Sequence, residues 1–167
     1  MRRSRYIVVL GVFFSFIWPQ CIDGIEIELW DMCYNIEETT TLQLPSSGLS
    51  GEIPPEIGEL INLTYLNLFS NQLTGEIPVE IENLTNLTIL NLMDNQLTGD
   101  IPPEIGNMTN LSYLNIGSNY FTGELTSWIG NLINLWYLDL KMNQLSGNIP
   151  SEISNLVNLI ILHLNDN

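Results

Sequence analysis

The sequence predicts a solenoid, a stack of similar turns that each add one short strand to a parallel β-sheet and return through an extended or 3₁₀ segment. A pattern of Leu, Asn, Gly and Ile-Pro recurs every 24 residues along positions 39–167. The composition is skewed in the same direction, with 27 Leu and 20 Asn among 167 residues. Asn favours neither helices nor strands, so this frequency indicates one structural use that is repeated along the chain.

The first twenty residues have the layout of a secretory signal peptide. Met1–Arg5 is basic, residues 6–18 form an apolar run of 13, and Pro19 ends it. A membrane-spanning helix needs about 20 apolar residues, so this run is too short for an anchor. We therefore expect an exported protein with residues 1–20 removed. The cleavage point is poorly marked and is expected between positions 20 and 24.

The next segment, residues 21–38, is predicted to form an N-terminal cap and contains both cysteines. Two cysteines in an exported chain favour a single disulfide, Cys21–Cys33, which closes a short loop. Alternatively, cleavage after Gly24 removes Cys21 and leaves Cys33 as a buried thiol. Two cysteines without a CxxC motif and a single histidine do not suggest a zinc site, and we predict neither a metal site nor a cofactor.

The repeat unit reads LxxLxLxxNxLxGxIPxxIGNLxN. Five full copies occupy residues 39–158, and residues 159–167 begin a sixth. The xxLxL segment alternates, so it predicts a short strand with Leu66 and Leu68 pointing inward. Consecutive strands are expected to stack in parallel, about 4.8 Å apart. A single repeat cannot bury its own apolar edges, so the stack is the folding unit.

Two polar columns of the repeat have a structural interpretation. The Asn that follows each strand can donate to and accept from backbone groups at the turn, which predicts a ladder of stacked amides. Its members are Asn71, Asn95, Asn119 and Asn143. The Gly four positions later permits a backbone bend. Ile-Pro then begins the return arm.

The pattern resembles leucine-rich repeat proteins over residues 39–167. The LxGxIPxxIGNLxN half is similar to the plant-type subclass found in receptor-kinase ectodomains and polygalacturonase inhibitors, and in bacterial secreted proteins. The resemblance implies an α/β-type leucine-rich repeat solenoid, with its parallel sheet on the concave face and its 3₁₀ or extended arms on the convex face. The cap differs from the plant proteins, in which a tightly spaced Cys pair surrounds a Trp; here 11 residues separate the cysteines.

The family resemblance implies recognition of a protein, peptide or glycan on the concave face. The variable strand positions would supply the contacts, and aromatic side chains there suit recognition because they offer large contact areas. The predicted partner-binding residues are Tyr65, Asn67, Phe69, Ile89, Asn91, Met93, Tyr113, Asn115, Trp136, Tyr137, Asp139 and Lys141. Alternatively, such residues simply fit exposed strand positions.

Charge and motifs exclude other classes of function. The net charge is −15, and three of the four basic residues lie at positions 2–5, which argues against nucleic-acid binding. Acidic residues share repeat positions and are interpreted as a solvated face, with loose Ca²⁺ or a basic partner as the alternative. The single histidine, His163, permits no catalytic triad, so we predict a non-catalytic protein.

The fourth copy departs from the consensus at four positions: Tyr120, Phe121, Thr126 and Trp128. Phe121 is expected in the core, and Tyr120 and Trp128 either form an exposed patch or reflect drift. Five Asn-x-Ser/Thr sequons begin within the first three copies, at Asn62, Asn83, Asn86, Asn107 and Asn110.

The sequence ends within a repeat, at Asn167. This indicates either an N-terminal fragment or a short protein that covers residues 159–164 by pairing with another chain. The sequence therefore predicts an exported recognition module that is either secreted or held at the cell surface. The alternative is a piece of a larger adhesion protein or of a receptor-kinase ectodomain.

Overall fold

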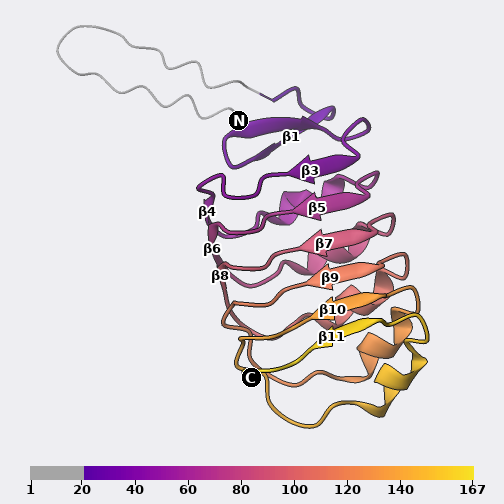
Figure 1. Cartoon of the computed structure of the whole chain (residues 1–167). Helices are drawn as coiled ribbons and strands as arrows, with labels where there is room; N and C mark the ends of the chain where they lie inside the picture. The colour runs from indigo at the N-terminus through magenta and orange to yellow at the C-terminus, as the bar shows by residue number, and fades with distance from the viewer. Residues whose placement is uncertain (1–20) are drawn as a thin grey trace, which may run out of the picture.

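The computed structural model describes residues 21–167. The predicted signal peptide lies outside the described residues. A ladder of short strands runs down one side of the molecule, with each turn of the chain stacked on the one before it (Figure 1). The fold is the predicted solenoid, with the parallel sheet on the concave face and 3₁₀ turns on the convex face.

The concave sheet has the order β11-β10-β9-β7-β5-β3, and every neighbouring pair is parallel. Its register follows the repeat, because Tyr65 pairs with Ile89, Ile89 with Tyr113, and Tyr113 with Tyr137. The strands are β3 (Thr41–Gln43), β5 (Tyr65–Asn67), β7 (Ile89–Asn91), β9 (Tyr113–Asn115), β10 (Tyr137–Asp139) and β11 (Ile161–His163).

A second, shorter sheet lies at the turn that follows each concave strand. It contains β4 (Ser50–Gly51), β6 (Gln72–Gly75) and β8 (Gln96–Leu97), all parallel. Bridges from Asp100 to Thr122 and from Glu124 to Ser146 continue it into the later repeats. Gly75 has φ +75°, and a Cβ there would lie 2.8 Å from the Glu52 side chain, so this bend requires glycine.

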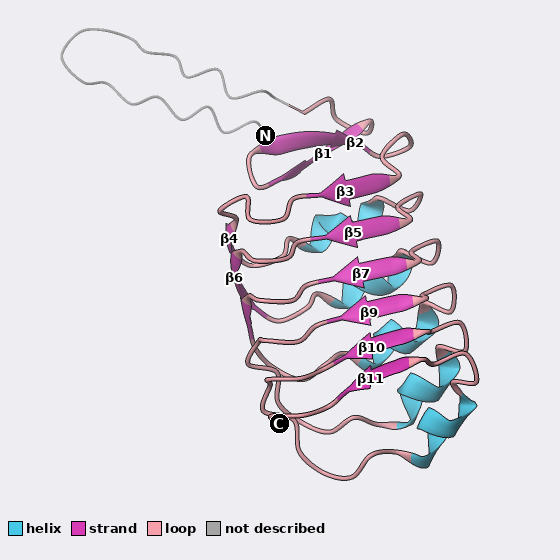
Figure 2. Cartoon of the chain, viewed as in Figure 1, coloured by secondary structure: helices cyan, strands magenta, loops and turns pink. Residues whose placement is uncertain are grey.

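The return arms contain five short 3₁₀ helices, which form a second row behind the strands (Figure 2). They are η1 (Pro55–Glu59), η2 (Val79–Asn83), η3 (Pro103–Asn107), η4 (Ser127–Asn131) and η5 (Ser151–Asn155). Proline immediately precedes each helix except η4, where Thr126 takes that position in an extended conformation. Proline suits this place because it favours the extended backbone and cannot donate to a preceding turn.

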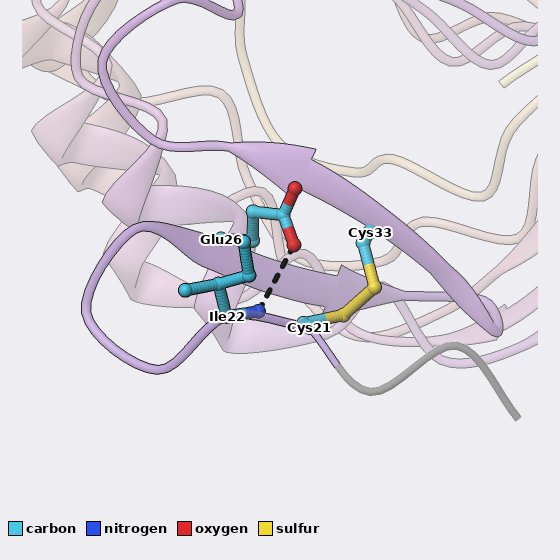
Figure 3. Close-up of a disulfide and its surroundings, with 4 residues drawn as sticks. All are labelled: Cys21, Ile22, Glu26 and Cys33. Carbon is cyan, nitrogen blue, oxygen red and sulfur yellow. Dashed lines mark hydrogen bonds between the residues drawn. A yellow bond between two sulfur atoms is a disulfide. The ribbon is translucent and has the colours of Figure 1, made fainter.

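An antiparallel hairpin, β1 (Glu26–Leu29) and β2 (Met32–Asn35), precedes the first repeat. The predicted disulfide is present: Cys21 is bonded to Cys33, which lies on β2. Figure 3 shows this bond beside the Ile22 amide, which donates to Glu26 Oε2 at 2.9 Å. The side chains of Ile27 and Leu29 are buried in the same core as the repeats.

The core is one continuous cluster that runs through the stack. Leu66 and Leu68 are fully buried, as predicted, and Phe121 is also in the core. Of the two alternatives given for Tyr120 and Trp128, a shared exposed patch does not hold, because Trp128 is only 6% exposed whereas Tyr120 is 52% exposed. A Cβ at Gly106 would lie 3.0 Å from Trp128 Cβ, and Gly58 and Gly130 approach Glu80 and Glu152 of the following repeats in the same way. Within residues 21–167, no helix has the length and apolarity needed for a membrane crossing.

A candidate recognition surface on the concave sheet

The predicted partner-binding residues lie along β5, β7, β9 and β10 and in the residues that flank these strands. Most are half-buried, and Trp136 is 41% exposed. Asn115 and Asp139 differ from the expectation for contact residues, because their exposed fractions are 3% and 0%. Their side chains accept hydrogen bonds from the backbone N–H groups of Gly117 and Lys141, so they lie beneath the surface and position the residues above them.

One hydrogen bond explains this orientation and recurs in four repeats. The side-chain oxygen at the end of each strand accepts the backbone N–H two residues later, at 3.0–3.1 Å. The four acceptors are Asn67, Asn91, Asn115 and Asp139. An oxygen is sufficient for this bond, so Asp139 replaces Asn without losing it. The replacement instead changes what the second side-chain atom can bind.

At Asp139 the second oxygen collects three donors. Oδ2 lies 3.1 Å from the Tyr137 hydroxyl, 3.3 Å from Lys141 Nζ and 3.2 Å from His163 Nδ1. At Asn115 the corresponding amide nitrogen donates instead, to the Tyr113 hydroxyl at 3.3 Å. The two tyrosines therefore play opposite roles: the Tyr137 hydroxyl donates to a carboxylate, and the Tyr113 hydroxyl accepts from an amide.

The charge of Asp139 is compensated locally. Lys141 is the sole Lys or Arg among residues 21–167, and it lies on this buried carboxylate. Burial, followed by the charge of Asp139 and its hydrogen bond, raises the pKa of Tyr137 above its ordinary value of 10.0. The phenol therefore stays protonated and remains a donor across the neutral and acidic range.

Three aromatic rings form a cluster over this carboxylate. Tyr113 and Tyr137 are stacked, with ring centroids 4.4 Å apart and an interplanar angle of 10°. The Trp136 ring packs edge-on against Tyr137 at 5.7 Å and tilted against Tyr113 at 5.8 Å. His163 meets the Tyr137 ring edge-on at 6.0 Å. Such contacts restrict the orientations of the rings. We call Tyr113, Trp136, Tyr137, Asp139 and His163 the aromatic–carboxylate cluster.

Gly117 lies close to Asp139. The equivalent positions in other repeats are Phe69, Met93 and Lys141. A Cβ at Gly117 would lie 3.0 Å from Asp139 Oδ1 and 3.2 Å from the Lys141 carbonyl oxygen. No positive φ requires glycine here, so a side chain at position 117 would crowd the carboxylate without straining the backbone.

The earlier repeats present the same columns without this cluster. Tyr65 pairs in register with Thr41 on one side and Ile89 on the other. Among the described residues, every recorded ring–ring contact lies between positions 113 and 163. The predicted surface is thus divided into a part with isolated side chains and a part with a pre-ordered group.

The Asn residues that follow the strands form the predicted ladder of amides, and Asn119 is a representative member. Its Nδ2 donates to the Leu92, Ile116 and Gly117 carbonyl oxygens at 3.0–3.2 Å, and its Oδ1 accepts from Leu97 N at 3.0 Å. The same set of bonds recurs at Asn71, Asn95 and Asn143.

A second ladder was not predicted. An Asn just before each strand donates through Nδ2 to a carbonyl oxygen 25 residues earlier, at 2.8–3.0 Å. The donors of this outer Asn ladder are Asn62, Asn86, Asn110, Asn134 and Asn158. Their 24-residue recurrence was visible in the sequence. Beside them, the hydroxyls of Thr64, Thr88 and Ser112 donate to carbonyl oxygens 24 residues earlier.

The acidic columns lie on other faces and do not converge. Within residues 21–167, no group of three or more His, Cys, Asp or Glu side chains is placed to hold a metal ion. The concave surface itself carries little charge apart from Asp139 and its two basic neighbours. The concave surface therefore presents mainly aromatic and hydrogen-bonding groups, and the acidic columns lie on the other faces.

Residues 42–167 match the family model described as a leucine-rich repeat region. The chain belongs to the leucine-rich repeat family. Among curated protein sequences, none matches it. The family fold is typical of binding modules, and the solved structures that resemble this chain include ectodomains of plant receptor kinases.

Three solved structures illustrate the similarity: two ectodomains from Arabidopsis thaliana and one Arabidopsis receptor kinase. GASSHO1/SCHENGEN3, solved with CASPARIAN STRIP INTEGRITY FACTOR 2, is 44% identical over 70% of this chain and 14% of its own, with a TM-score of 0.67. SOBIR1 is 36% identical over 75% of this chain and 69% of its own, with a TM-score of 0.72.

HAESA, solved with the peptide hormone IDA and the co-receptor SERK1, is 35% identical over 72% of this chain and 20% of its own, with a TM-score of 0.69. The leucine-rich repeat chain described here therefore spans a fifth or less of the HAESA and GASSHO1/SCHENGEN3 structures.

Proposed function

We propose that this leucine-rich repeat segment recognises an extracellular peptide through its concave face, and that the aromatic–carboxylate cluster is the centre of the contact. The observation that carries the proposal is the ordered group of rings over Asp139, in which Trp136 is 41% exposed. Aromatic residues that are already fixed in place lose little conformational entropy on binding, and they dominate recognition surfaces.

The similarity to receptor ectodomains favours a peptide over a glycan. HAESA is described with a peptide hormone, and its identity to this chain is 35%. The likeness also supports a place for this chain within an extracellular receptor ectodomain. That second proposal concerns the whole protein, because the chain spans 20% of HAESA.

The geometry assigns different roles to the predicted contacts. Trp136 and the exposed edges of Tyr113 and Tyr137 would contact the peptide directly. Asp139 and Asn115 are positioning residues, since both are buried and bind the tyrosine hydroxyls. Tyr65, Asn67, Phe69, Ile89, Asn91 and Met93 would extend the contact along the sheet, with Lys141 at its far end.

The test is selection of peptides from a synthetic random-sequence display library on the full chain. Selected peptides are then measured against the wild type and Trp136→Thr, which restores the Ser/Thr type found at positions 64, 88 and 112. We expect peptides that bind the wild type and lose at least about 30-fold in affinity for the variant, the loss of a hot-spot side chain. Equal affinities, or a library that yields no peptide, would contradict the proposal.

A further inference from the structure

The five sequons lie at one edge of the solenoid, where each return arm passes into the next concave strand. We call this the strand-start edge, residues 61–64, 83–88, 107–112, 131–136 and 155–160. The sequon asparagines are Asn62, Asn83, Asn86, Asn107 and Asn110. The structure divides them into two classes by what their amide nitrogens bind.

Three of them belong to the outer Asn ladder. Nδ2 of Asn62, Asn86 and Asn110 donates to a carbonyl oxygen of the preceding turn at 2.9, 2.9 and 2.8 Å. A sugar on this nitrogen replaces one of its two hydrogens, so the ladder bond must use the remaining hydrogen while the sugar is held close to the preceding turn. The hydroxyls that complete these sequons are also used, because each donates to a carbonyl oxygen of the preceding repeat.

The other two are free of the ladder. Asn83 and Asn107 are exposed residues at the ends of η2 and η3. Asn107 Nδ2 donates to the Glu82 carboxylate at 2.7 Å, an exposed contact that joins no backbone groups. Among residues 21–167, no hydrogen bond is recorded for the Asn83 amide. A substituent at either nitrogen therefore leaves every hydrogen bond of the outer Asn ladder in place.

The sequons end where the aromatic–carboxylate cluster begins. Asn134 keeps its ladder bond to the Thr109 carbonyl oxygen at 2.8 Å, but Trp136 occupies the hydroxyl position two residues later. Asn131 is exposed in the same way as Asn107, but Ile133 follows it. The later repeats therefore keep the Asn columns and lack the Ser or Thr that a sequon requires.

We propose that Asn83 and Asn107 carry N-linked glycans, whereas Asn62, Asn86 and Asn110 remain unmodified in the folded protein. The glycans would cover the strand-start edge at residues 83–88 and 107–112, and would leave it bare at residues 131–136 and 155–160, beside Trp136 and Tyr137. This inference requires export through a eukaryotic secretory pathway, and it does not depend on the identity of the peptide.

The modification is a group transfer from a lipid-pyrophosphate-linked oligosaccharide. The Asn Nδ2 forms a bond to C1 of the first sugar as the bond from C1 to the pyrophosphate oxygen breaks. The lipid pyrophosphate leaves, and the amide proton passes to a base of the transferase. No electrons are gained or lost overall. A chain modified at Asn83 and Asn107 can still form all of its ladder bonds when it folds.

The first experiment maps the modified sites in the full chain. The protein is expressed in plant cells, the soluble folded fraction is collected, and the glycans are removed enzymatically in ¹⁸O-water, so that each formerly modified Asn becomes a labelled Asp. We expect label at positions 83 and 107 alone. Label at any ladder position, or no label at all, would overturn the proposal.

Two matched variants create new sequons in the repeat that has none. Ile133→Thr completes a sequon at Asn131, the ladder-free class, and Trp136→Thr completes one at Asn134, the ladder class. We expect Ile133→Thr to gain one glycan mass and Trp136→Thr to gain none. Both substitutions are at exposed positions, 52% and 41% respectively. The opposite result, or equal modification of both, would show that the ladder does not select the sites.

Discussion

The second and fifth repeats share one scaffold and differ in what they display. Both bury the same Leu columns and hold the same Asn after the strand. In the second repeat, Tyr65 stands beside Thr41 and Ile89, whereas in the fifth Tyr137 is stacked on Tyr113 and bound to Asp139. The comparison shows that a solenoid can change the residues in its surface columns while its buried Leu and Asn columns stay the same.

The largest expected effect on stability tests whether the buried Asn contributes equally in different repeats. Asn119→Ala removes one acceptor and three donated contacts from a buried site and leaves backbone groups unpaired. We expect a loss of about 3 kcal/mol in unfolding free energy, measured by urea denaturation. Asn95→Ala, in the third repeat, should cost the same within about 1 kcal/mol. A much smaller loss at either position would mean that the stack is not uniform.

Asn86→Ala is the matched control for the buried ladder. This residue is exposed and makes one ladder bond, to the Ile61 carbonyl oxygen. Water can replace that bond, so we expect a loss of less than about 1 kcal/mol. A loss equal to that of Asn119→Ala would show that the outer ladder matters as much as the inner one.

Asp139→Asn gives the fifth repeat the residue that the fourth repeat has at the equivalent position, Asn115. The oxygen that accepts Lys141 N is kept, and the oxygen that collects Tyr137, Lys141 and His163 is replaced by an amide donor. We expect a loss of about 1–2 kcal/mol in unfolding free energy, because hydrogen bonds to a charged acceptor are lost. The reciprocal change, Asn115→Asp, should cost as much or more, since Lys141 and His163 do not face that side chain. An unchanged unfolding free energy in Asp139→Asn would contradict the claim that the carboxylate stabilises the fold.

The pKa of Tyr137 gives a pH-dependent test of the same group. Its folded-state pKa is raised above the ordinary 10.0, so folding favours the protonated phenol. This contribution to stability is fully present below pH 10 and declines as the pH rises through the folded-state pKa. The alkaline loss of stability should therefore be smaller in Tyr137→Phe than in the wild type, measured by urea denaturation at several pH values. Tyr34, whose pKa burial also raises, contributes equally to both proteins. Identical pH profiles would contradict the assignment.

The smallest expected effect on stability comes from Trp136→Thr, produced without glycosylation. The ring contacts with Tyr113 and Tyr137 are lost, and a hydroxyl that can reach the Ser112 carbonyl oxygen is gained, as at Ser112 itself. We expect a net change within about 1 kcal/mol. A large loss would make Trp136 part of the scaffold and remove it from the set of displayed residues.

The repeat made most of the fold predictable. Leu66 and Leu68 face inward because strand residues alternate, and the 24-residue spacing fixes the register between strands. The Cys21–Cys33 bond followed from two cysteines in one short segment. These features depend on residue type and spacing alone.

The cluster was predictable only in part. Tyr113, Trp136, Tyr137 and Asp139 were placed on one face by the repeat. Whether a polar side chain in that column points outward or back depends on local hydrogen bonding, so the burial of Asp139 and its three donors could not be foreseen. The burial of Trp128 likewise was not settled by the sequence, because Glu80, Glu104 and Glu152 stand at the same repeat position and none of them is buried.

The most direct test compares two tyrosines of the same column. A peptide selected on the wild-type chain is titrated by calorimetry against Tyr137→Ala and Tyr65→Ala. The account predicts at least about a 30-fold loss of affinity for Tyr137→Ala and less than about 5-fold for Tyr65→Ala, since one tyrosine belongs to the ordered cluster and the other is isolated. Equal losses, or a larger loss for Tyr65→Ala, would contradict the claim that recognition is centred on the aromatic–carboxylate cluster.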